Sequence, residues 1–170
     1  MSWLQDDTAK APILVLAVGN PSRGDDAFGP LLAQRLSTWL DEVPNPDLHT
    51  QVEVICDQQL VVEHVLDLQG RQRVLFIDAA AQGDAPLALT TVAALSAPPA
   101  VTSHACTPAQ LLALHQAMLH AEPPPADLLT VVGQGFELGH PLSASAEQGL
   151  QNAWPLLQAW LNQSGDAAHA

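Results

Sequence analysis

Residues 11–30 decide the fold and read A-P-I-L-V-L-A-V-G-N-P-S-R-G-D-D-A-F-G-P. The apolar run at 13–18 is typical of a buried strand in a parallel sheet. A Gly-Asn-Pro-Ser turn follows, and then two acids, Asp25 and Asp26, stand where the next helix should begin. Open α/β folds keep ligand sites where such a strand ends in a turn. The stretch therefore predicts an α/β fold with a site near two carboxylates.

Apolar runs alternate with helical patterns along the rest of the chain. The predicted strands cover residues 13–18, 52–56, 73–78 and 128–132, with a short edge strand at 87–92. The predicted helices cover 26–40 with Asp25 or Asp26 as N-cap, 60–68, 108–119 with Thr107 as N-cap, and a last one from Ser143 or Ser145 to 161; residues 44–47 are predicted as a loop. This alternation predicts a three-layer α/β/α sandwich around a mostly parallel, twisted sheet of about five strands. We expect residues 1–170 to form a single domain with loose tails at 1–10 and 163–170.

The charge of the chain excludes some classes of partner. With one lysine, four arginines and a net charge of -13, the protein should repel nucleic acid and anionic membranes. A partner protein with a basic surface fits this negative charge better. No apolar run approaches the ~18 residues of a membrane span, and residues 1–7 lack a signal-peptide pattern. The two cysteines, Cys56 and Cys106, form no disulfide framework, so we expect a reduced, cytoplasmic protein without membrane insertion.

Phosphate binding is the first chemistry to weigh. The spacing of Gly19 and Gly24 resembles the opening of a P-loop, which would continue with Lys and Ser or Thr. Here Asp25 and Asp26 follow instead, and their charges would repel phosphate. Nucleotide binding is therefore disfavoured.

A metal site is the second. Asp26 follows the first strand, Asp78 ends the third, and His104 precedes a later helix, so all three are expected at the same edge of the sheet. Carboxylates with imidazole suit nickel, zinc or iron. Each residue also has an ordinary interpretation, because Asp26 can be a helix cap, Asp78 a strand end and His104 a solvated loop histidine.

Nucleophilic catalysis is the third. His104 and Cys106 lie two residues apart, so a Cys–His pair has to be considered. Cysteine is, however, most often a small buried apolar residue. His140, in a loop that can reach the site, is a weaker candidate.

The chain resembles the hydrogenase maturation endopeptidases at four places. Residues 19–30 match the family's opening Gly-Asn, acidic pair and Gly-Pro, although Ala27 stands where glycine is usual. The other matches are the strand end Phe76-Ile77-Asp78-Ala79, the Ser-His and Thr-Pro of residues 103–108, and Gly133-Gln134-Gly135-Phe136-Glu137-Leu138-Gly139. The resemblance extends from about residue 12 to 162 and gives no role to Glu137.

This resemblance implies a protease that removes a C-terminal extension from the precursor of a nickel–iron hydrogenase large subunit after nickel insertion. It implies that Asp26, Asp78 and His104 contact the metal, and that the nickel belongs to the substrate, so that the free enzyme needs none. Asp25 either shares this contact or only caps the helix. Two alternatives stay open: a non-catalytic, metal-sensing chaperone of the same subunit, and a self-contained metallohydrolase.

Overall fold

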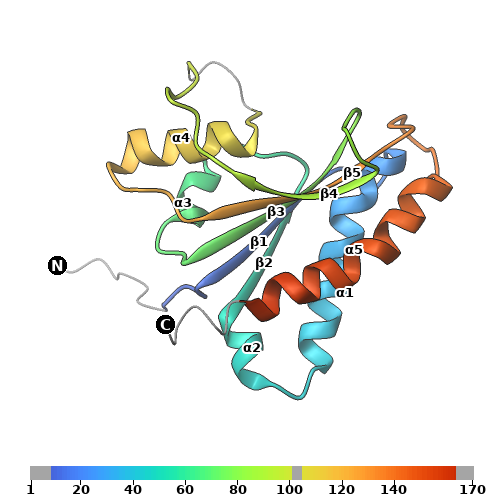
Figure 1. Cartoon of the computed structure of the whole chain (residues 1–170), viewed down its shortest axis with the longest axis horizontal. Coiled ribbons are helices and arrows are strands. Elements are labelled where there is room, and N and C mark those ends of the chain that lie inside the picture. The colour runs from blue at the N-terminus through green and yellow to red at the C-terminus, as the bar shows by residue number, and fades with distance from the viewer. Residues whose placement is uncertain (1–8, 101–104, 164–170) are drawn as a thin grey trace.

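A five-stranded sheet forms the centre of the computed structural model, which describes residues 9–100 and 105–163 (Figure 1). The strands are β1 (Ile13–Val18), β2 (Val52–Asp57), β3 (Arg73–Ala80), β4 (Leu87–Val92) and β5 (Ala126–Val132). Their order is β2-β1-β3-β5-β4, and only β4 is antiparallel to its neighbour. The predicted edge strand at 87–92 is thus confirmed.

Helices cover both faces of the sheet. On one side lie α1 (Phe28–Glu42) and α5 (Ala144–Asn162), and on the other lie α3 (His64–Leu68) and α4 (Pro108–Leu119) (Figure 1). Strand β1 has apolar side chains on both faces, because successive residues of a strand point to opposite sides. Val15 and Ala17 belong to the core under α1 and α5, whereas Leu16 and Val18 belong to the core under α3 and α4. The predicted three-layer sandwich is therefore confirmed. Within the described residues, no helix combines the length and apolar character that crossing a membrane requires.

Two elements differ from the sequence prediction. Residues 46–51 form a short helix, α2 (Pro46–Gln51), whose first two residues lie in the loop predicted at 44–47. The side chain of Asn45 caps it by accepting a hydrogen bond from Asp47 N, and Pro46 fits the first helical turn. Helix α3 begins at His64 rather than at residue 60. Before it, His64 N, Val65 N and Leu66 N donate to carbonyls three residues back, so residues 61–63 form turns, and the Leu60 carbonyl accepts a hydrogen bond from Cys106 N.

The helix ends were predicted with mixed success. Thr107 caps α4 as predicted and also forms a complete capping box with Gln110, and Ser143, one of the two predicted residues, caps α5. The prediction that Asp25 or Asp26 caps the first helix is wrong. A turn of 3-10 helix, η1 (Gly24–Ala27), contains both acids, and α1 begins after Ala27 without a side-chain cap.

Candidate active site at the carboxyl edge of the sheet

A hollow of about 360 Å³ opens where β1 and β3 end. Its polar side consists of two carboxylates and two amides, from Asp26, Asp78, Gln58 and Gln59. Its remaining wall is apolar or weakly polar and comes from Val18, Leu60, Ala79, Ala81, Cys106 and Phe136. The hollow lies at the strand edge where parallel α/β folds place their ligands.

Asp78 enters the hollow from β3. It stands one residue beyond Ile77, the last position of β3 paired with β1. Burial raises the pKa of Asp78 to about 6; a hydrogen bond from Ala79 N–H opposes the rise, and the negative charge of Asp26 adds to it. The two carboxylates therefore repel each other, and a cation bound between them would relieve this repulsion.

Asp26 is held by the turn that follows β1. Its Oδ2 atom accepts a hydrogen bond of 2.7 Å from Asn20 N. Gly19 has a φ of +146°, and a Cβ atom at this position would lie 2.0 Å from the carbonyl oxygen of Asp26. The glycine is therefore needed for the turn to fold back closely enough to place the acid beside β3.

Asp25, by contrast, is fully buried and does not line the hollow. Its carboxylate accepts hydrogen bonds from Gln134 N (2.6 Å), Ser143 N (2.7 Å) and the Ser143 hydroxyl (2.7 Å). Burial alone would raise the pKa of Asp25, but the hydrogen bonds from Gln134, Ser143 and Gly135 outweigh it and lower the pKa. Asp25 thus stabilises the start of α5 rather than its own helix.

His104 lies outside the described residues, so the structure brings together two of the three predicted metal ligands. Among residues 9–100 and 105–163, no three His, Cys, Asp or Glu side chains are grouped to hold a metal ion. The chain after position 104 is anchored at the hollow, because Cys106 N donates a hydrogen bond of 2.8 Å to Leu60 O and Cys106 lines the wall. The assignment of Asp26, Asp78 and His104 as metal-contacting residues stays a prediction.

The two other candidates do not show the properties of catalytic groups. Burial, followed by the negative charge of Glu63, raises the pKa of the Cys106 thiol, whereas a nucleophilic cysteine needs a lowered pKa. His140 does not line the hollow: its ring is exposed and lies 3.0 Å from the carboxylate of Glu137, which is exposed as well. The expectation that His140 can reach the site therefore finds no support in the geometry.

Sequence reasoning missed the role of Phe136 in the wall of the hollow. Its loop is one of the motifs in the resemblance, but no pattern in the sequence pairs that loop with the turn after β1. The signal that was present is the cluster of glycines at 133, 135 and 139 around an aromatic residue, which indicates close packing of a backbone against another segment.

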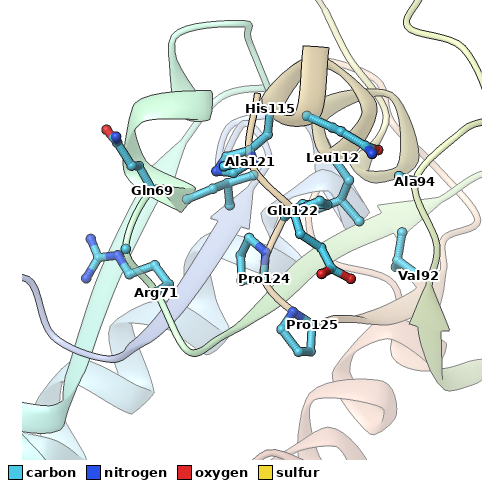
Figure 2. A pocket seen from close by; sticks show the side chains of 14 residues that line it. Gln69, Arg71, Val92, Ala94, Leu112, His115, Ala121, Glu122, Pro124 and Pro125 are labelled. Carbon is cyan, nitrogen blue, oxygen red and sulfur yellow. The ribbon is translucent and has the colours of Figure 1, made fainter. Parts of the chain in front are cut away.

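A larger hollow of about 820 Å³ opens on the same face at the opposite, amino-terminal edge of the sheet (Figure 2). Leu112 and His115 from α4 lie on one side of it, and Pro124 and Pro125 on the other. Burial lowers the pKa of His115, against a hydrogen bond with the Ala121 backbone. Of the described residues that line this hollow, Glu122 alone is acidic, so it offers no pair of carboxylates.

The comparisons with known proteins concern the fold. No family model and no curated protein matches the sequence. Similar solved structures include the [NiFe] hydrogenase maturation protease HycI from Thermococcus kodakarensis, at 21% identity over 91% of this chain and 95% of that one, with a TM-score of 0.63. The hydrogenase maturating endopeptidase HybD from E. coli is 23% identical over 90% of this chain and 93% of its own, with a TM-score of 0.63. A further endopeptidase from Escherichia coli gives 23%, the same coverage and a TM-score of 0.67. The protein has the fold of the hydrogenase maturation proteases.

Proposed function

We propose that this protein is an endopeptidase that removes the C-terminal extension of a nickel–iron hydrogenase large subunit after nickel insertion. The observation that carries the proposal is the pairing of Asp26 and Asp78 in one hollow, on a fold whose similar solved structures are named as hydrogenase maturation proteases. The substrate is the precursor subunit, and the setting is cytoplasmic. Two free cysteines and a net charge of -13 support a reduced compartment and a basic surface on the partner.

In this proposal the nickel arrives as part of the substrate. Asp26, Asp78 and His104 form an open set of two carboxylates and one imidazole, which can contact an ion that the substrate already holds. Docking on the ion orients the scissile peptide next to the hollow, so that the contribution of this chain is mainly positioning. A divalent ion held there would supply polarisation of the peptide carbonyl and an activated water molecule as the attacking group.

The first test compares precursor subunit with and without nickel. We expect the purified protein to cut the nickel-loaded precursor and to leave the nickel-free one intact over the same time, with products identified by mass spectrometry. The shared hollow supplies the reason, since without the ion two neighbouring carboxylates have no positive group to bind. Equal cleavage of both precursors would contradict nickel-dependent recognition. Stable binding without any cleavage would favour the chaperone alternative, and tight retention of metal by the purified protein alone would favour the metallohydrolase.

The second test concerns Cys106. We expect Cys106→Ser to keep at least a tenth of the activity, because the raised pKa of this thiol leaves little thiolate at neutral pH. Initial rates on the precursor, before and after treatment with iodoacetamide, measure the effect. Cys56→Ser, at an exposed position of β2, is the matched control for alkylation at the second thiol. Complete loss of activity in Cys106→Ser alone would instead support a thiol protease.

A further inference from the structure

Two loops that are more than a hundred residues apart in sequence are joined beside the hollow. Asp25 N donates to Gly135 O at 2.8 Å, Gly24 N donates to His140 O at 3.2 Å, and Gly139 N donates to Ser22 O at 2.8 Å. These bonds connect the loop that contains the acidic pair to residues 133–143, between β5 and α5. The second loop is thus attached along its length rather than at its ends alone.

The Asp25 carboxylate lies at the centre of this junction. Three donors of the second loop, on Gln134 and Ser143, point to its two oxygens, and it is 0% exposed. Hydrogen bonds to a buried carboxylate are charge-assisted and therefore stronger than neutral ones. Removal of the charge would leave several donors facing a poor acceptor.

The junction determines where Phe136 lies. Arg23 Nε donates to the Phe136 carbonyl at 3.1 Å, which fixes the backbone. The ring packs over Gly133, where an added Cβ atom would lie 2.5 Å from Phe136 Cζ and 2.9 Å from Asp25 Cβ. Only a residue without a side chain allows the ring and Asp25 to approach the loop from both sides at this point.

The two side chains next to the junction face the same hollow. Asp26 directly follows Asp25 and provides a carboxylate, while Phe136 provides part of the apolar wall together with Val18 and Leu60. The lining of the hollow therefore includes both carboxylates and apolar side chains, and the Asp25 junction links the chain segments that carry Asp26 and Phe136. If the metal of a substrate binds at the two carboxylates, a substrate side chain next to that metal would contact Phe136.

We propose that Phe136 is a specificity-determining residue that receives an apolar side chain of the substrate next to the scissile bond, and that Asp25 is a positioning residue that holds Phe136 and Asp26 in a fixed relation. The inference rests on the proposed function. It explains why a buried acid stands beside the acid of the site, and it gives a role to the glycine-rich motif at 133–139.

The specificity of Phe136 is tested by steady-state kinetics on nickel-loaded precursor. We expect Phe136→Ala to raise KM about tenfold with a smaller effect on kcat, and Phe136→Leu to restore most of the loss, because an apolar contact made in the bound state contributes mainly to binding. A second substrate is a precursor in which one residue flanking the cut is replaced by Asp. This replacement should lower the cleavage rate of the wild-type enzyme by a larger factor than that of Phe136→Ala. Leu138→Ala is the matched control, since Leu138 belongs to the same loop, is 74% exposed and does not line the hollow.

The positioning role of Asp25 is tested by hydrogen exchange together with kinetics. In Asp25→Asn, the amides of Gln134 and Ser143 should exchange at least tenfold faster than in the wild type, and kcat should fall. Ser143→Ala removes one of the bonds to Asp25 together with the cap bond from Ala146 N, and should give a smaller change in the same direction at Gln134, whereas Ser143→Thr keeps the hydroxyl and should restore both bonds. Asp41→Asn, at an exposed position of α1, is the control. If Asp25→Asn fails to fold, the two variants Ser143→Ala and Ser143→Thr provide the test.

Each negative result has a separate meaning. A wild-type protein that leaves nickel-loaded precursor intact would overturn the proposed function. An active wild type with unchanged KM in Phe136→Ala would overturn the specificity role alone. Unchanged exchange at Gln134 and Ser143 in both the Asp25 and the Ser143→Ala variants would overturn the positioning role, whether or not the protein cleaves the precursor.

Discussion

Asp26→Asn is expected to lower kcat/KM for the nickel-loaded precursor by on the order of 100-fold, the upper end of the range found when even a residue that supports a metal ligand is lost. The substitution keeps the size of the side chain and an oxygen that can accept the 2.7 Å hydrogen bond from Asn20 N. It removes the negative charge that faces Asp78 in the hollow. A loss of kcat/KM in this variant therefore results from the missing charge and not from a disrupted turn.

The measurement is a comparison of initial rates at several precursor concentrations, with the thermal unfolding of each variant recorded beside them. Asp41→Asn changes the net charge by the same amount at an exposed position of α1 and should retain wild-type kinetics. His104→Ala should resemble Asp26→Asn, since the same ligand set is predicted to include it. Wild-type rates in Asp26→Asn would remove this residue from the proposed site and leave Asp78 without its partner.

The outline of this site could be predicted from sequence because it depends on strand ends. Apolar runs place β1 and most of β3; Asp26 follows β1 after the turn, and Asp78 lies near the carboxyl end of β3. The strand order β2-β1-β3-β5-β4, however, cannot be read from these runs, because it depends on how the connecting helices cross the sheet. It is this order that makes β1 and β3 neighbours and brings Asp26 near Asp78.

The roles within the acidic pair could not be predicted for a different reason. Locally, Asp25 and Asp26 both fit a helix start, and local sequence offers no way to separate them. The group that separates them is Ser143, 118 positions further along the chain. A buried carboxylate has to find its donors wherever the tertiary structure provides them, so its role is decided by packing and not by its neighbours in sequence.

Asp78→Asn should raise the stability of the free protein at neutral pH while it abolishes cleavage. In the folded chain the pKa of Asp78 is about 6, above the ordinary value of 3.8, with burial as the main cause. The unfolded chain therefore releases this proton first as the pH rises. Between about pH 4 and pH 7 ionisation of Asp78 progressively lowers the free energy of unfolding, and above about pH 7 the loss is constant at up to about 3 kcal/mol.

The variant lacks this titration, so its gain over the wild type should be small at pH 4 and full at pH 7.5, where it corresponds to several degrees in Tm. Urea unfolding at both pH values measures the difference, and Asp84→Asn, an exposed acid between β3 and β4, is the control for the loss of one charge. The lowered pKa of His115 affects wild type and variant alike and cancels in the comparison. A gain of the same size at both pH values would mean that ionisation of Asp78 does not destabilise the folded protein. The predicted pattern has a functional reason: a carboxylate that is costly to ionise in the free protein is stabilised when a cation binds beside it, so its charge favours the metal-loaded substrate over the empty state.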